Sequence, residues 1–509
     1  MKLSPNGRCL GLMCGAVLAI VAVQPSRAQA PGTVKWVFKA GGRVDSSPAL
    51  GLDGAILFKA SDGQVYSLTS AGGLKWKRVV GSGPIAKHSS SPAIGSDGTV
   101  FVGGGTDAGG GGYFYALNPA DGSVKWASLG GTAYIEGGPI TSRHPDTFHS
   151  PALGLDGQVF VSSQIGRVYV FGTDGSLLRE TSSSNNSPRI PTIDSQGIPY
   201  VCQSSVPEGT GTFGLARLRP DGTPARFVTI STNRTDPCEG TRVSTGHDGT
   251  LYVVSRVTSL WAFTPDAKLK WKLPFNVSQA PAVGADGTLF ALSGVSTVDS
   301  GATTRLHAIS TAGTQLWSLD LARADWPGQY TPAIDSNGIV YAGSSLWLFA
   351  VTPDGKVKWQ FQTSSPITTS PLIDGSGTIY VGTFDGNLYA LHGDSNGLTS
   401  SSWPMFNADA RHTGQGRALT PLVFGNPAEC LFNWAERSYS SLFKPALPES
   451  FNSPPYYYRS YSATVAFLGT STQDQHVYYL GPLSNDTVLD VGPLASWLAL
   501  AGCAATPAQ

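Results

Sequence analysis

The chain has 509 residues, and its 34 basic and 34 acidic side chains cancel. Charged residues make up only 13% of the chain, which excludes a coiled coil, a charged disordered tail and a basic nucleic-acid binder. The 62 glycines and 35 prolines are typical of many short strands joined by tight turns. We therefore expect an all-β protein with no nucleic-acid partner.

The N-terminus has the pattern of an export signal. A basic start, an apolar run over residues 10–23 and small residues near Ala28 are typical of a secretory signal peptide, which we assign to residues 1–28. An uncleaved membrane anchor is the alternative, although the run is shorter than a span of about 20 residues. Bulky Met13 before Cys14 disfavours a lipoprotein signal. We expect an exported protein, periplasmic or extracellular, with no transmembrane segment in the mature chain.

Eight copies of one phrase fill the next part of the chain, and they determine the architecture. Each copy has an anchor residue in a short apolar strand (a), a glycine six residues later, and then further β-prone runs (b, c and d). Four antiparallel strands per repeat are typical of propeller blades. We predict an eight-bladed β-propeller over residues 31–416. The anchors are Pro48, Pro92, Pro151, Pro191, Val243, Pro281, Pro332 and Pro371.

A turn followed by Trp ends most copies, as in NPADGSVKW (118–126) and TPDGKVKW (352–359). This element, with the motif WPMFNADARHTG (403–414), resembles the repeat of the PQQ (pyrroloquinoline-quinone)-type propellers. That family includes eight-bladed quinoprotein dehydrogenases and BamB-type scaffolds. The resemblance implies that the Trp of one blade packs on the next blade. The structural tryptophans expected are Trp36, Trp76, Trp126, Trp271, Trp317 and Trp359.

Two irregularities in this pattern carry predictions. The Trp is replaced by Arg179-Glu180 in the third copy and by Arg226-Phe227 in the fourth. We therefore expect weaker packing between these blades and their neighbours. Trp36 precedes the first anchor, in a strand d without strands a to c of its own, whereas the last copy lacks a strand d. We predict that the N-terminal strand completes the eighth blade.

Unequal connections suggest which face binds a ligand. The b–c connections at 103–112, 203–212 and 293–304 and the d–a connection at 130–148 are long, and in a blade both kinds emerge on the same face. Binding residues often lie on long loops that a rigid scaffold positions, so we expect the ligand to bind at this face.

An exported chain with four cysteines outside the signal suggests two disulfides. Three pairings are possible, and proximity in sequence favours Cys202–Cys238 and Cys430–Cys503.

A polar residue stands two positions before every anchor, in a strand that is otherwise apolar. One hypothesis is that these residues form a polar channel that binds a ligand. The alternative is a water-filled channel that binds no ligand, because the central channel of every propeller must be lined by some side chains. The candidate ligand-binding residues are Ser46, Ser90, His149, Arg189, Thr241, Gln279, Tyr330 and Thr369.

Catalysis is the alternative to binding. The quinoprotein dehydrogenases of the family carry an adjacent cysteine pair, a metal site and an Asp base, whereas no two cysteines are adjacent here. The spacing of His144, Asp146 and His149 matches no known metal site. We predict no catalytic residues, no cofactor and no metal. A degenerate quinoprotein oxidoreductase with PQQ and Ca²⁺ is the runner-up, and a carbohydrate-binding surface protein is the third hypothesis.

The tail is predicted to be a separate unit. Residues 417–427 have the composition of a linker, and residues 428–509 indicate a small disulfide-bonded α+β domain. We expect its elements in the order α-β-β-α: a helix at 428–443, strands at 456–468 and 475–480, and a helix in 488–503 after Pro493. The whole chain is expected to be a monomeric, non-catalytic scaffold that binds a protein or peptide partner in the cell envelope.

Overall fold

A computed structural model of the chain describes most of residues 29–416 and five strands between 450 and 493. The stretches outside the described residues are 1–28, 82–89, 105–111, 129–132, 135–147, 155–156, 164–166, 183–189, 195–196, 205–212, 219–223, 232–242, 256–258, 266–267, 276, 278, 298–300, 324–329, 417–449, 454–455, 462–465, 472–475, 481–487 and 494–509. The signal peptide, Cys238, Cys430 and Cys503, and the side chain of Cys202 therefore lie outside the description.

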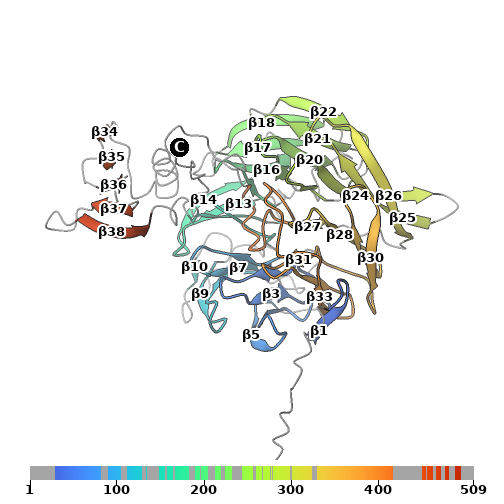
Figure 1. Cartoon of the computed structure of the whole chain (residues 1–509). Coiled ribbons are helices and arrows are strands. Elements are labelled where there is room, and N and C mark those ends of the chain that lie inside the picture. Colours follow the sequence, from blue (N-terminus) through green and yellow to red (C-terminus); the bar gives the residue numbers. More distant parts are fainter. Residues whose placement is uncertain are drawn as a thin grey trace, which may run out of the picture.

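Eight antiparallel sheets form the ring, which confirms the predicted eight-bladed propeller (Figure 1). The strands run a to d from the channel outward. Blades 1 to 4 comprise β2 (Ala49–Leu50), β3 (Ile56–Lys59), β4 (Gln64–Leu68), β5 (Leu74–Val79); β6 (Ala93–Ile94), β7 (Val100–Gly103), β8 (Phe114–Leu117), β9 (Val124–Ser128); β11 (Ala152–Leu153), β12 (Val159–Ser162), β13 (Arg167–Phe171), β14 (Leu177–Ser182); and β15 (Thr192–Ile193), β16 (Pro199–Ser204), β17 (Phe213–Leu218), β18 (Pro224–Ser231).

The second half of the ring follows the same plan. Blades 5 to 8 comprise β19 (Val243–Thr245), β20 (Leu251–Ser255), β21 (Ser259–Phe263), β22 (Leu269–Leu273); β23 (Ala282–Val283), β24 (Leu289–Thr297), β25 (Gly301–Ile309), β26 (Gln315–Arg323); β27 (Ala333–Ile334), β28 (Val340–Ser344), β29 (Trp347–Val351), β30 (Val357–Gln362); and β31 (Leu372–Ile373), β32 (Thr378–Gly382), β33 (Asn387–His392), β1 (Val34–Lys39).

Each strand b is buried on both faces because it lies between two neighbouring blades. The four residues of β3 and of β7 are all buried, whereas β5 and β30 alternate between exposed and covered positions on the rim. The hydrophobic clusters span neighbouring blades: one joins Leu57 and Trp76 of blade 1 to Ile94 and Val100 of blade 2. Burial of these apolar side chains between the sheets is the main force that holds the ring together.

The Asp-Gly turns explain the recurring a–b phrase. In blade 2 the Asp97 carboxylate accepts the backbone N–H of Thr99 at 2.9 Å, and Gly98 adopts a φ of 84°, which a side chain would strain. In blade 7 the aspartate comes two positions earlier. There Asp335 is buried, and it accepts the backbone N–H of Ile339 at 2.9 Å and the Tyr341 hydroxyl at 2.8 Å.

The N-terminal strand completes blade 8, as predicted. Strand β1 pairs antiparallel with β33, with Trp36 opposite Ala390 and Lys39 opposite Asn387. The backbone N–H of Gly32 donates to His392 O at 2.7 Å, so Gly32 takes the place of a c–d turn glycine although the turn itself is broken. The two ends of the repeat region therefore meet in one sheet.

Tryptophan side chains join one blade to the c–d turn of the next. Each indole Nε1 donates to an oxygen in that turn, as Trp76 does to Pro119 O and Trp126 does to Thr173 O, both at 2.9 Å. The remaining four donors and acceptors are Trp36 to Ser70 O, Trp271 to Thr311 O, Trp317 to Pro353 O and Trp359 to Asp394 Oδ2.

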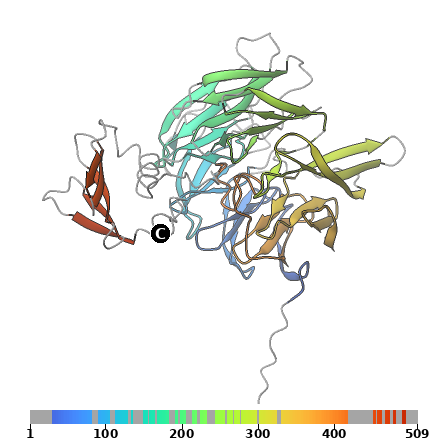
Figure 2. The same cartoon turned by 45° about the horizontal axis from the view of Figure 1, so that its top comes forward.

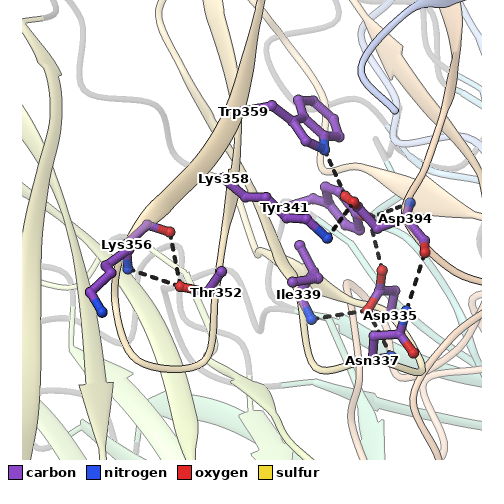
Figure 3. Close-up of polar contacts among 9 residues, drawn as sticks. All are labelled: Asp335, Asn337, Ile339, Tyr341, Thr352, Lys356, Lys358, Trp359 and Asp394. Atoms are coloured by element: carbon purple, nitrogen blue, oxygen red, sulfur yellow. Dashed lines mark hydrogen bonds and ion pairs between the residues drawn. The ribbon is translucent and has the colours of Figure 1, made fainter. Parts of the chain in front are cut away.

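The joint between blades 7 and 8 replaces the usual carbonyl with a carboxylate (Figure 3). Asp394 accepts from Trp359 Nε1 at 2.6 Å and from the Tyr341 hydroxyl at 3.1 Å, and it pairs with Lys358 Nζ at 2.7 Å. The Asp394 side chain is only 1% exposed. These contacts fix blade 7 to the blade that the N-terminal strand closes.

Two blades are larger than the repeat predicts. Blade 2 has a fifth strand, β10 (Ala133–Tyr134), which pairs with β9 inside the connection expected to be a loop. In blade 6 the expected loop at 293–304 is instead a continuation of the β24–β25 hairpin, paired as far as Thr297 opposite Gly301. Figure 2 shows this hairpin projecting beyond the ring. Its β-branched residues, among them Val295, Thr297 and Thr303, favour extended pairing over the expected loop.

The tail contains a five-stranded antiparallel sheet of β34 (Ser450–Ser453), β35 (Tyr456–Tyr461), β36 (Ala466–Ser471), β37 (His476–Leu480) and β38 (Val488–Pro493), in that order. The single strand expected at 456–468 is two strands, β35 and β36, and β34 and β38 were not anticipated. The expected helices at 428–443 and after Pro493 lie outside the described residues.

Candidate functional site

The ring has two unlike faces. Because successive strands are antiparallel, the a–b and c–d turns share one face, which we call the turn face. The b–c turns and d–a connections share the opposite face, which we call the loop face. The innermost strands, a, present their free edges to the central channel, and each anchor proline lacks an N–H on that edge.

A segment after the last blade occupies the channel at the turn face. Residues 397–416, which we call the strap, accept backbone N–H groups from strand a of six blades. Each donor is the second residue after an anchor. The donors are Leu50 to Ala410 O, Ile94 to Arg411 O, Leu153 to Thr413 O, Ile193 to Gly414 O, Val283 to Trp403 O and Ile334 to Pro404 O, at 2.6–3.0 Å.

The strap is buried along most of its length. Met405 and His412 are fully buried, and Trp403 and Phe406 are 2% and 3% exposed. The strap therefore fills the turn-face end of the channel. The motif 403–414 pointed to the family, but sequence reasoning did not place it in the channel.

The strands a are tied to one another by a hydroxyl at the position directly before the anchor. The Ser47 N–H donates to Ser91 Oγ at 3.1 Å, and the Ser91 N–H donates to Ser150 Oγ at 2.8 Å. The same kind of bond joins blade 8 to blade 1, where the ring closes: the Ser370 N–H donates to Ser47 Oγ at 3.0 Å. Sequence reasoning missed this role, although the Ser-Pro dipeptide recurring in the copies was the available signal.

The polar residues two positions before the anchors have a local role where the structure describes it. Ser46 Oγ accepts the Lys59 N–H at 2.6 Å, Ser90 Oγ accepts the Gly103 N–H at 2.9 Å, and Thr369 Oγ1 accepts the Gly382 N–H at 2.8 Å. Each hydroxyl thus ties strand a to strand b of its own blade.

The other members of this predicted ring differ in burial. His149 is buried, and its carbonyl accepts the Ser90 hydroxyl at 3.1 Å. Gln279 and Tyr330 are half-buried. Arg189 and Thr241 lie outside the described residues. The structure therefore places six of the eight candidates, and the side-chain hydroxyls of three of them tie strand a to strand b.

A charged cluster lies at the loop-face end of blade 1. Arg43 Nε donates to Asp45, and Lys59 Nζ donates to Gly103 O at 2.9 Å. Burial raises the pKa of Asp45, against the lowering effect of Arg43. Burial also lowers the pKa of Lys59 to about 8, although the charge of Asp45 opposes the shift. Tyr330 lies within the electrostatic reach of Arg43 and Asp45, and burial raises its pKa.

Beside this cluster stands an exposed aromatic ring. Phe384, in the b–c turn of blade 8, is 56% exposed, and the Arg43 guanidinium lies 5.1 Å from its ring centroid. The partly exposed Arg43 and the exposed Phe384 ring therefore lie side by side at the loop face, whereas the Lys59 side chain is buried. Sequence reasoning missed both Arg43 and Phe384.

Metal and membrane features can be stated for the described part of the chain. There, no group of three or more His, Cys, Asp or Glu side chains is placed to hold a metal ion. In the same residues, no helix has the length and apolar character that crossing a bilayer requires.

Comparison with known proteins places the chain among propellers. A family model described as "Outer membrane protein assembly factor BamB" matches residues 24–205 and 223–412. Among solved structures, BamB from Moraxella catarrhalis matches with a TM-score of 0.50 and 14% identity, over 71% of this chain and 99% of that chain. At this identity the likeness concerns the fold. No curated protein matches the sequence.

Proposed function

The chain belongs to the family of the outer membrane protein assembly factor BamB, and on this premise we propose that it is an exported, non-catalytic scaffold that binds a protein or peptide of the cell envelope through its loop face. The observation that carries the proposal is the strap, which occupies the turn-face end of the channel with six backbone hydrogen bonds. A partner then has the loop face and the outer rim available.

The channel residues support a surface site more than a channel ligand. The hydroxyls of Ser46, Ser90 and Thr369 are used between strands a and b, so they hold the wall together. The loop face, by contrast, carries Arg43 and Phe384, whose residue types are enriched at protein interfaces. Binding by loops on a rigid ring requires little reorganisation of the scaffold.

A face-resolved photo-crosslinking experiment tests the proposal. Strand β30 offers a matched pair, because exposed Gln362 ends it at the loop face and exposed Lys356 precedes it at the turn face. A benzophenone amino acid at position 362 should give a discrete adduct in the native envelope, whereas position 356 should give none. An adduct from position 356 alone would contradict the proposed face.

Titration with PQQ in the presence of Ca²⁺, followed by absorbance, tests the non-catalytic part. We expect no stoichiometric uptake and no dye-linked alcohol oxidation. Tight uptake with turnover would replace this proposal with the oxidoreductase hypothesis. A glycan array tests the carbohydrate-binding hypothesis in the same way.

A further inference from the structure

The b–c turn of blade 8 departs from its equivalents in other blades. Phe384 stands thirteen residues after its anchor, where blade 1 has Ser61 and blade 7 has Ser345. Among the described residues, it is the one aromatic side chain in the set of strongly exposed large hydrophobic residues. The fold accepts serine at this position in two other blades, so folding does not require a phenylalanine here.

The turn holds Phe384 in a fixed place. The Gly386 N–H donates to Thr383 O at 3.0 Å and closes a four-residue turn, and the Phe384 N–H donates to Pro366 O at 2.9 Å. The exposed ring is therefore presented by a hydrogen-bonded backbone. Such preorganisation lowers the entropy lost when a partner binds.

Arg43 lies against the Phe384 ring and is itself held in place by Asp45. Its Nε donates to Asp45, whose side chain is 8% exposed, while its guanidinium lies 5.1 Å from the Phe384 ring centroid. Within the described residues the Nη groups of Arg43 make no hydrogen bond. The Arg43 side chain is 33% exposed.

We propose that Phe384 and Arg43 form a contact point for a protein segment that carries an acidic side chain next to an aromatic or large apolar one. This inference rests on the proposed function and names the chemistry of its partner. The two Nη groups of Arg43 match a carboxylate in a bidentate geometry. The face of Phe384 offers apolar area to the neighbouring side chain.

Charge complementarity selects this partner over a purely apolar one. Asp45 uses only the Nε edge of Arg43, and a second carboxylate on the Nη edge would make a charge-assisted pair. Phe, Tyr and Arg are the residue types enriched at interfaces, and central aromatic and arginine side chains carry most of the binding energy there.

The test uses the full-length protein and a random 12-residue peptide library displayed on phage. Peptides enriched on the wild type are synthesised, and their Kd values are measured by calorimetry on three variants. Phe384→Ser installs the residue that blade 1 has at this position, and Arg43→Lys keeps the charge but loses the bidentate fork. Leu52→Ser is the matched control, because Leu52 is also 56% exposed but lies on the turn face. Melting temperatures verify that each variant folds.

We expect enriched peptides to combine an acidic residue with a neighbouring aromatic or apolar one. Their affinity should fall at least about tenfold in Phe384→Ser and in Arg43→Lys, and it should be unchanged in Leu52→Ser. Peptides that bind the wild type and all three variants with equal affinity would overturn this contact point and leave the loop-face proposal standing. Loss of affinity in Leu52→Ser alone, or no enrichment over an uncoated surface, would overturn both proposals.

Discussion

At the scale of single residues, Lys59 shows the cost of burying a cation between blades 1 and 2. It is 4% exposed, and burial lowers its pKa from 10.5 to about 8. Between those pH values the unfolded chain binds more protons than the folded one, so the contribution of Lys59 to stability rises with pH across that window. Below pH 8 its destabilising effect is complete, and above about 10.5 it disappears.

We predict that the free energy of unfolding of the wild type, minus that of Lys59→Met, rises from pH 8 to pH 10. Urea unfolding at a series of pH values measures it. Lys77→Met, on the exposed rim of the same blade, is the control and should show no such rise. A difference between wild type and Lys59→Met that does not depend on pH would show that Lys59 titrates normally.

Asp394 is the second residue with a measurable role. Asp394→Ala leaves Tyr341 and Trp359 without a shared acceptor and leaves Lys358 without its anion. We predict a loss of about 3 kcal/mol in the free energy of unfolding. Asp354→Ala, which removes an exposed ion pair with Lys356 in the same blade, should leave stability unchanged. Equal effects of the two substitutions would refute the role given to Asp394.

Sequence reasoning located polar residues at this scale but not their partners. The pattern singled out Ser46, Ser90 and Thr369, yet their hydroxyls bond to residues thirteen positions later. The bond from the Ser47 N–H to Ser91 Oγ crosses from one blade to the next, 44 residues away. A repeat shows which residue types recur, but the partner of each atom depends on how the blades pack.

At the scale of elements, the joints between blades depend on glycine as much as on tryptophan. A Cβ on Gly122 would lie 2.5 Å from Trp76 Cε3, whereas a Cβ on Gly54 would meet nothing within 4 Å. Both glycines have a positive φ, 72° and 76°. The pair therefore separates the steric cost of the joint from the cost of the backbone conformation.

We predict that Gly54→Ala lowers the free energy of unfolding by about 1 kcal/mol, because the φ is unfavourable for any L side chain. Gly122→Ala should cost a further 1–3 kcal/mol or so, because the indole must move. Thermal unfolding of the two variants compares them directly. Equal costs would mean that Trp76 does not pack on this turn in solution.

The joints without Trp are partly compensated. At the joint between blades 4 and 5, the Tyr200 hydroxyl lies 3.4 Å from Pro265 O, the turn carbonyl that an indole uses elsewhere. Phe227 packs on a cluster that includes Val168 and Val201. The sequence predicted where Trp was missing. The substitute donor comes from strand b, nine residues after its anchor, where blade 7 has Tyr341.

The N-terminal strand is the element on which closure depends. Deletion of residues 31–40 removes β1, exposes the edge of β33 and uncovers Trp359, against which Gly32 packs. We predict that this deletion abolishes cooperative unfolding, as followed by circular dichroism. A deletion variant with an unchanged melting transition would refute closure by this strand.

At the scale of the whole molecule, both ends of the repeat region are used to close the ring. The first end supplies strand d of blade 8, and the sequence predicted this from a Trp without a repeat of its own. The second end supplies the strap, which the sequence did not place. Its contacts are backbone hydrogen bonds to strands up to 360 residues earlier, as from Leu50 to Ala410, and backbone groups leave no side-chain signature.

The two closures together give the molecule its functional asymmetry. The turn face has short turns and a filled channel end, while the loop face has the long connections and the Arg43–Phe384 pair. The fold could be predicted because one phrase recurs eight times. The candidate contact point could not, because Phe384 is visible only as a departure from a position that is serine in other blades.

Hydrogen exchange read by mass spectrometry tests this closed ring most directly, on the backbone amides of Leu50, Ile94, Leu153, Ile193, Val283 and Ile334. In the full chain these six amides should be as protected as those of the buried strands b. In a chain ended after residue 396 they should exchange much faster than the strand b amides. Fast exchange of the six amides in the full chain would contradict the strap, and with it the assignment of binding to the loop face.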